Sequence, residues 1–491
     1  MRHVQHPQRH FGQVDIAEIA IDPRSRDDIP ALLKGLQHLY VNDEIRKKVF
    51  AILENTLGEE VNREVGRPGM ELWKIFVLGT LKLGMNCDYD RLQELANQHS
   101  TLRQMLGHSD WTDTETYALQ TLIDNVSKLT PAILSEINQV VVEAGHALLK
   151  KKSGEILKGR CDSFVVETDV HYPTDTNLLW DAMRKLLTGL GRACDEHGIS
   201  GWRQYQYNLR QLKKRFRKTQ KLRHSNSKDE TKRAAKRKQI NAAYEAYLAS
   251  ARTLVTKAEI SLESLAQQGH VVIVTALQDA IRHAVRQIDQ IERRVLKGEV
   301  IPHEEKVFSL FEEHTEWICK GKAGVPVELG VRVCVLEDQH QFILHHQIMW
   351  KETDDKIAIS MVEGAQDRYP DLRQCSFDKG FYTPTNRDKL DIVLDHVILP
   401  RKGRLTEQDK QHEYSEDFIL ARHQHSAVES CINNLEQRGL DRCLSYGRHG
   451  FERHVALSIV ACNLHRIGLL LQRQERARLQ KEKRKRQRLA A

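Results

Sequence analysis

Three acidic residues that lie far apart in the sequence have neighbours that suit metal chemistry. Asp162 precedes Ser163 in a β-prone stretch, Asp378 ends a later apolar stretch, and Glu429 lies in a helical segment. Magnesium prefers oxygen ligands, and two such ions ~3.5–4 Å apart stabilise both oxygens of an in-line phosphoryl displacement. Such a site needs about three carboxylates that converge from separate elements, two from rigid strands and one from a helix across the sheet. Asp162, Asp378 and Glu429 are therefore candidate metal ligands.

Each of these acids also has a purely structural explanation. Asp378 before a Lys-Gly pair fits an ordinary turn aspartate. Ser426 and Glu429 have the spacing of a capping box, in which the glutamate only bonds the start of its helix. Asp162 competes with other acids nearby, of which Asp169 is the substitute for the first position. Only the order of the surrounding elements favours a shared metal-binding role for all three acids.

Hydrophobic spacing predicts the elements that would position them. Residues 161–170 are rich in β-formers, and from Pro326 the apolar residues alternate with a period of two, which predicts a strand and then an antiparallel hairpin. We expect one sheet in a mixed α/β fold. The elements expected after the hairpin strands (327–335 and 342–344) are a helix at 357–369, a strand into Asp378, a helix at 385–390, a strand at 392–399, and helices at 428–435 and 455–471.

The remaining segments are predicted to be helical. In residues 1–150, a helix over 72–81 ends at Gly84, Asp88 caps a second helix, and Thr130-Pro131 begins a third. Two short helices joined by a tight turn fit a helix-turn-helix DNA reader, and they also fit any small helical bundle. Residues 175–296 form a second helical stretch, read as a long hairpin or a small bundle.

Composition excludes several classes of protein. The chain has 491 residues, 75 Lys and Arg against 67 Asp and Glu, and 40% hydrophobic residues, which is enough for a sizeable core. No run of 18 uncharged apolar residues occurs, the N-terminus lacks the apolar stretch of a secretory signal, and nine cysteines include no Cys-x-x-Cys. We expect a cytoplasmic protein with reduced thiols rather than a membrane-spanning or disulfide-framed one.

The net charge of +8 is unevenly distributed along the chain. Residues 210–238 carry fourteen Lys or Arg and two acids, and residues 471–491 carry nine Lys or Arg and two acids. Such segments indicate a polyanionic partner, with nucleic acid first. Alternatively, residues 210–238 form a solvated hairpin or a dimer contact, and residues 481–488 are either a fraying helix end or a non-specific DNA arm. Zinc at His345-His346, or at His423 and His425 with Cys431, is a further alternative that lacks a paired-cysteine spacing.

Several short motifs follow one another along the chain: Gly66-Arg67-Pro68, Asp162–Glu167, His171–Asp175, Phe308–Trp317, Asp378–Tyr382, Leu399-Pro400-Arg401 and Val428-Glu429. Any one of them is weak, and the ordered set is specific. In this order, the motifs resemble those of the DDE transposases of bacterial insertion sequences, in an unclassified or related group. The resemblance implies a bacterial, nucleoid-associated protein.

The resemblance implies an RNase H-like catalytic domain interrupted by a long all-helical insertion, with a helical N-terminal DNA-binding domain. It implies that Asp162, Asp378 and Glu429 are catalytic and hold two Mg²⁺ ions, for which Mn²⁺ can substitute. Some relatives have Arg four residues before the Glu, where this chain has His425. The implied domains are 1–150 (DNA-binding), 151–175 (first catalytic strand), 176–310 (basic insertion), 311–470 (remaining catalytic core) and 471–491 (basic tail).

The implied activity is Mg²⁺-dependent cleavage at the ends of the chain's own insertion sequence, followed by attack of the freed 3′-hydroxyl on target DNA. The implied partners are the terminal inverted repeats, target DNA and a second copy of the chain in a synaptic dimer. The alternatives are a catalytically inactive DNA-binding relative and a metal-dependent nuclease without strand transfer. The candidate DNA contacts are Arg67, Lys213, Lys214, Arg215, Arg217, Lys218, Arg401, Lys402, Arg422 and His425.

Overall fold

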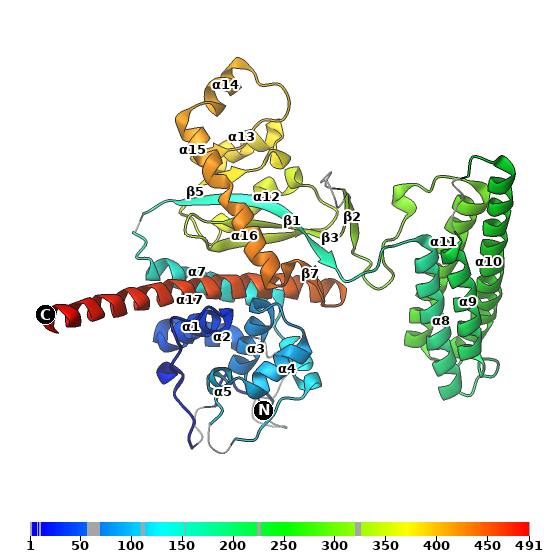
Figure 1. Cartoon of the computed structure of the whole chain (residues 1–491), viewed down its shortest axis with the longest axis horizontal. Helices are drawn as coiled ribbons and strands as arrows, with labels where there is room; N and C mark the ends of the chain where they lie inside the picture. The colour runs from blue at the N-terminus through cyan, green and yellow to red at the C-terminus, as the bar shows by residue number, and fades with distance from the viewer. Residues whose placement is uncertain are drawn as a thin grey trace. The chain divides into compact units, whose positions relative to one another are not determined.

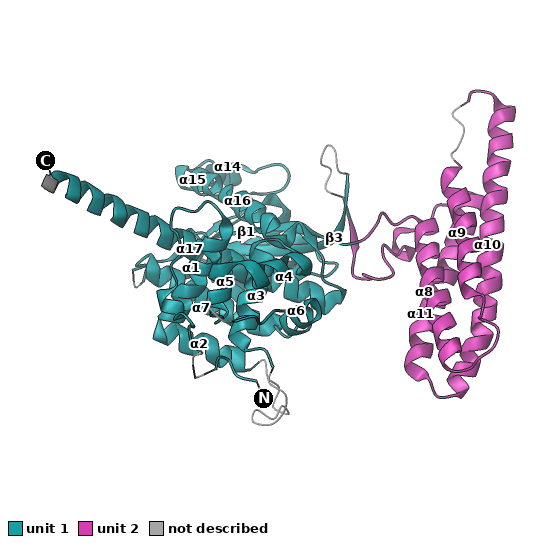
Figure 2. Ribbon diagram, turned by 60° about the horizontal axis from the view of Figure 1, so that its bottom comes forward, with its two compact units in different colours: residues 1–169, 318–491 teal, residues 170–317 magenta. Residues whose placement is uncertain are grey.

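The chain divides into two compact units, each described by itself (Figure 2). The first unit comprises Met1–Asp169 and Ile318–Ala491, and the second comprises Val170–Trp317. The computed structural model describes residues 2–6, 8, 11–55, 69–109, 113–152, 154–222, 227–319 and 326–490, without the side chains of 489 and 490.

A mixed sheet runs through the first unit, and the expected mixed α/β class is confirmed (Figure 1). In the described residues the strand order is β2-β3-β1-β5-β6, with β4 beside β3 and β7 beside β1. The central strand β1 is antiparallel to β3 and parallel to β5 and β7, and β5 is parallel to β6. The strands are β1 (Leu157–Thr168), β2 (Glu316–Cys319), β3 (Val327–Glu337), β4 (Ile343–Met349), β5 (Leu372–Phe377), β6 (His396–Ile398) and β7 (Arg442–Cys443).

The predicted hairpin is confirmed, because β3 and β4 are antiparallel neighbours. The predicted strand at 392–399 is wrong in its first half. Thr383 caps helix α13 (Pro384–Val393) and Pro384 occupies its first turn, so the helix continues through Ile392, and only His396–Ile398 forms a strand.

The helices of the first unit follow their local capping signals. Asp88 accepts a hydrogen bond from the Arg91 N–H at 2.8 Å, and Thr130 accepts one from the Ile133 N–H at 3.4 Å, so both predicted N-caps are confirmed. The helices are α1 (Asp28–Val41), α2 (Asp43–Glu54), α3 (Leu72–Gly84), α4 (Tyr89–Gln98), α5 (Ser100–Met105), α6 (Leu119–Val126), α7 (Pro131–Leu148), α12 (Asp354–Gln366), α13, α14 (Glu407–Glu413), α15 (Glu416–His425), α16 (Ala427–Leu435) and α17 (Gly447–Ala490).

The N-terminal helices share one hydrophobic core with α12, α17 and one face of the sheet. Helices α1 and α17 approach so closely that a Cβ atom added at Gly468 would lie 1.8 Å from the Ala31 carbonyl oxygen. Helix α3 is buried over almost its whole length, whereas α4 exposes Asp90, Arg91 and Glu94. Of the two helices proposed as a helix-turn-helix pair, only α4 therefore presents a face to solvent.

The opposite face of the sheet carries a second, smaller core. Phe164 and Val166 of β1 belong to it, together with side chains of α16 and α17. Cys161 belongs instead to the first core. Since successive strand residues point to opposite faces, Asp162 lies on the same face as Phe164, under α16.

The second unit is helical, as expected for residues 175–296, and has its own core. Trp202, Leu212 and Phe216 are buried in that core. Its helices are α8 (Asp175–Glu196), α9 (Tyr205–Lys221), α10 (Glu230–Gln267) and α11 (Val271–Ile291), followed by a π-helical turn (Glu292–Lys297).

Among the described residues, one helix is long and apolar enough, by length and composition, to cross a membrane. It is α17, and 83% of its most apolar window is buried inside the protein. A core helix passes the same test, and the packing of α17 against α1, α3 and α7 accounts for its apolar character.

Candidate metal centre

Asp162 and Asp378 lie at the same level on neighbouring parallel strands. In the register of β1 and β5, Cys161 pairs with Phe377, and each aspartate is the next residue along its strand direction. Neighbouring strands are ~4.8 Å apart, and residues in register point to the same face. Asp378 also begins a short 3₁₀ turn (Lys379–Phe381) without capping it through its side chain. Asp378 therefore stands at a turn, as its structural explanation has it, but its side chain does not bond that turn.

Glu429 comes from α16, which packs on β1 on the face that carries Asp162. Cys431 and Leu435 anchor this helix in the second core. The capping box considered for Ser426 and Glu429 is not formed. Ser426 has helical φ and ψ of −56° and −18°, and its hydroxyl donates to the His423 carbonyl oxygen at 2.7 Å. Glu429 is thus not used to cap its own helix.

The pKa of Asp162 depends on the charges of the other predicted acids. The pKa of Asp162 is raised to about 6, mainly by burial and also by the charges of Asp378, Asp354 and Glu429, whereas a hydrogen bond from the Ser163 N–H lowers it. Among the described residues, none of these four carboxylates forms an ion pair with Lys or Arg. Uncompensated carboxylates close to one another are the environment that a bound divalent cation neutralises.

Asp354, at the start of α12, is the acid that sequence reasoning missed. Its Oδ1 accepts a hydrogen bond from the Ser163 hydroxyl at 2.6 Å, next to Asp162. A Cβ atom added at Gly380 would lie 2.7 Å from its Oδ2, so Asp354 also touches the turn that follows Asp378. An acid in the first turn of a helix is usual near the helix dipole, so the sequence offered no signal that this one belongs to the site.

The three predicted acids are not close enough together to bind one ion jointly. Among the described residues, His108, Asp113 and Glu115 form a group whose ligand atoms all lie within 4.8 Å of one another, and the three predicted acids do not. Oxygens bound to two Mg²⁺ ions can lie up to about 8 Å apart, from two bonds of ~2.1 Å and an ion separation of ~3.5–4 Å. Asp162, Asp378 and Glu429 therefore do not suit a single ion held by all three.

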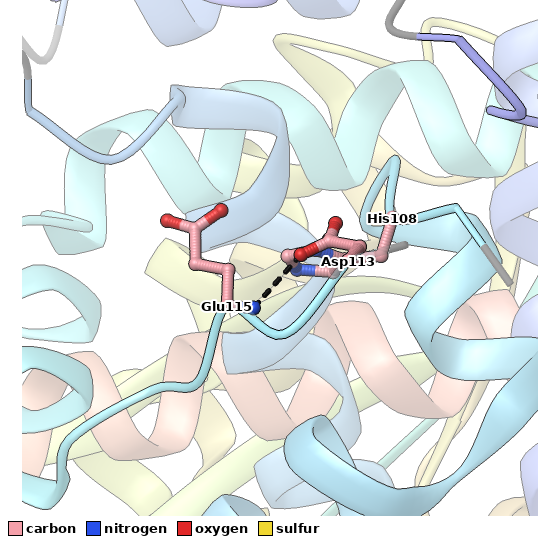
Figure 3. A group of neighbouring side chains, drawn as sticks. All are labelled: His108, Asp113 and Glu115. Carbon is pink, nitrogen blue, oxygen red and sulfur yellow. Dashed lines mark hydrogen bonds and ion pairs between the residues drawn. The ribbon is translucent and has the colours of Figure 1, made fainter. Parts of the chain in front are cut away.

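The group that does lie within 4.8 Å is explained by hydrogen bonding (Figure 3). His108 Nδ1 lies 2.5 Å from Asp113 Oδ2, and its Nε2 lies 2.7 Å from the Tyr117 hydroxyl, so both ring nitrogens are engaged. The Glu115 N–H donates to Asp113 Oδ1 at 2.9 Å. Arg103 Nη2 is 3.9 Å from the same carboxylate, and its positive charge opposes a cation there. This group stabilises a loop.

Two of the predicted DNA contacts lie beside the acids. His425 Nδ1 is 2.9 Å from the Ser376 hydroxyl, and burial lowers the pKa of His425 while the charges of Asp378 and Glu429 raise it. Lys402 Nζ donates to the Gly380 carbonyl oxygen at 2.7 Å, in the turn after Asp378. Both side chains thus come from segments next to the acids.

The other predicted residues of the first unit either lie away from the three acids or form an ion pair. Asp169 follows the end of β1, is exposed, and lies 3.9 Å from Arg442. It is seven residues beyond Asp162, or roughly 20 Å along an extended chain, so it does not join the other acids. Arg401 forms an ion pair with Asp409, and Arg422 is exposed on α15. Arg67 lies outside the described residues.

In the second unit, the predicted contacts Lys213, Lys214, Arg215, Arg217 and Lys218 are all exposed on α9. Lys213 Nζ also lies 5.7 Å from the centre of the Trp180 ring.

The zinc alternatives find no support in the described part of the chain. Neither His345 and His346 nor His423, His425 and Cys431 form a group with ligand atoms within 4.8 Å of one another.

No protein-family model, no curated protein and no solved structure matches this chain.

Proposed function

We propose that this chain is a DDE-type transposase that cleaves DNA at the ends of its own insertion sequence and transfers the freed strands to target DNA. The observation that carries the proposal is the alignment of Asp162 and Asp378 on neighbouring parallel strands, with the charge of Glu429 acting on Asp162 from the helix above. Asp162 lies in the middle of β1, Asp378 directly follows β5, and Glu429 belongs to a helix late in the chain.

The topology supports an RNase H-like catalytic domain for this chemistry. The first aspartate is on the central strand, the second follows a parallel neighbour, and the glutamate lies on a helix late in the chain. The second unit contributes residues between β1 and β3, in the position of the helical insertion that the resemblance implies.

The donor set fits a pair of Mg²⁺ ions, because it consists of hard carboxylate oxygens without ion-pair partners among the described residues. Asp162, Asp378 and Glu429 would hold them, and Mn²⁺ can replace Mg²⁺ with the same ligands. When bound, the two ions activate water or a 3′-hydroxyl and stabilise the leaving oxygen. Ser163 holds one oxygen of Asp162 through its N–H at 2.7 Å, so the other oxygen is free to bind a metal. Lys402 beside the Asp378 turn can contact a phosphate of the bound strand.

DNA is the partner that fits the basic surface of the second unit. Helix α9 exposes seven Lys or Arg side chains, and none of them forms an ion pair among the described residues. Phosphate contacts of this kind give salt-dependent affinity without sequence preference. A synaptic homodimer follows from the reaction, since two element ends must be held together.

The decisive experiment is incubation of the full chain with DNA that carries the ends of its own element, with and without Mg²⁺, scored for 3′-hydroxyl breaks. We expect Mg²⁺-dependent breaks at the ends, and their loss in Asp378→Ala while binding to end DNA is retained. Asp388→Ala, an exposed aspartate on α13, is the matched control.

Undiminished cutting by Asp378→Ala would remove this residue from the site. Binding of end DNA without any cutting by the unaltered chain would favour the inactive relative, and cutting without strand transfer would favour the nuclease.

A further inference from the structure

The C-terminal part of α17 extends beyond the core of the first unit (Figure 1, red). Leu470 and Gln472 are the last buried residues of this helix, and every residue from 477 to 488 is exposed. Glu475, which lies 3.6 Å from Lys34, marks the last ion pair with the rest of the unit among the described residues. Residues 477–488 thus form an exposed helical segment about 18 Å long at 1.5 Å per residue, which we call the basic arm.

The basic arm is positively charged around its whole circumference. It contains seven Lys or Arg and one acid, Glu482, which pairs with Arg478 at 3.8 Å. The other six cationic side chains form no ion pair among the described residues, and at 100° per residue they point to all sides of the helix. These six are Lys481, Lys483, Arg484, Lys485, Arg486 and Arg488.

This charge pattern excludes several partners. The only large apolar side chain in the arm is Leu479, so there is neither the apolar face of a membrane-surface helix nor the seam of a coiled coil. Like charges three or four residues apart, such as Lys481 with Lys485 and Arg484 with Arg488, destabilise the isolated helix. A polyanion that surrounds or follows the helix would relieve this repulsion.

We propose that the basic arm binds the phosphate backbone of duplex DNA without sequence preference. Duplex DNA carries one negative charge per about 1.7 Å of its axis, so a helix of about 18 Å spans roughly ten phosphates. The arm needs neither the carboxylates nor a metal ion, so this inference goes beyond the proposed reaction and adds a second DNA-binding surface to that of α9.

The test uses the full chain in EDTA with a fluorescent duplex of unrelated sequence, titrated at several salt concentrations. The variant K483Q/R484Q/K485Q/R486Q removes four charges, and glutamine preserves helix propensity. The control K47Q/K128Q/R373Q/K389Q removes four exposed charges from separate parts of the first unit.

We expect the slope of log affinity against log salt to become less steep by about 3–4 in the arm variant, at ~0.9 per lost phosphate contact. The control should change the slope by less than half as much. An unchanged slope in the arm variant, or an equal change in the control, would overturn the proposal. Binding of the arm to anionic phosphatidylserine vesicles with no loss of DNA binding in the variant would overturn it as well.

The test separates this proposal from the proposed function. If the arm variant loses DNA affinity and the unaltered chain never cuts DNA, the arm stands and the transposase proposal fails. If cutting depends on Asp378 and the arm variant binds DNA with an unchanged salt slope, the arm alone is refuted.

Discussion

Replacing Asp162 by Asn should stabilise the protein at neutral pH in the absence of divalent ions. The pKa of Asp162 is about 6 in the folded chain against 3.8 for the ordinary group, because of burial and the charges of Asp378, Asp354 and Glu429. A raised folded-state pKa means that the stabilising effect of the protonated form is complete below pH 3.8 and is lost as the pH rises through about 6.

The magnitude follows from the size of this shift. About two pKa units at 1.36 kcal/mol each correspond to about 3 kcal/mol of stability lost on ionisation at pH 8. Roughly half of that loss occurs between pH 5 and pH 8, so D162N should gain about 1.5 kcal/mol over the unaltered chain between these two pH values. The Asn side-chain oxygen can still accept the hydrogen bond from the Ser163 N–H.

The assay is urea unfolding followed by circular dichroism at pH 5 and pH 8, in EDTA and in Mg²⁺. Ions that bind only the folded chain should stabilise the unaltered protein and stabilise D162N much less. D169N is the control, because Asp169 is exposed and lies roughly 20 Å further along the chain. A D162N effect that is the same at both pH values, or equal stabilisation of both proteins by Mg²⁺, would refute the proposed charge cluster.

Two further predictions concern the other charged groups. D354N should reduce Mg²⁺-dependent cleavage at least tenfold, because Asp354 contacts both Ser163 and the Gly380 turn. The control variant D355N, one residue along α12, should cleave DNA at the normal rate. Equal cleavage rates for the two variants would remove Asp354 from the site. Replacing four exposed α9 cations by Gln should lower DNA affinity and reduce the salt slope by about 3–4, measured by fluorescence anisotropy, and an unchanged slope would assign α9 another role. The four cations are Lys213, Lys214, Arg217 and Lys218.

Local signals in the sequence determined most of the helices and the hairpin. The caps at Asp88 and Thr130 act within three residues, and the alternating valines of β3 reflect burial on one face of the strand, in the second core. Thr383-Pro384 carries the same kind of signal for α13, and the first part of the predicted strand at 392–399 belongs to this helix. Because capping and side-chain periodicity are short-range effects, they can be read without any tertiary contact.

The site depended on contacts that no local pattern contains. Asp162 and Asp378 are separated by 216 residues, and only the pairing of Cys161 with Phe377 sets them side by side. The hydrogen bond from Ser163 to Asp354 likewise joins segments that nothing in either stretch relates.

The sequence therefore determined which residue types were available for metal and DNA binding, and where helices and strands begin. The tertiary structure decided which carboxylates share one face of the sheet, because strand register is fixed by side-chain packing between distant segments.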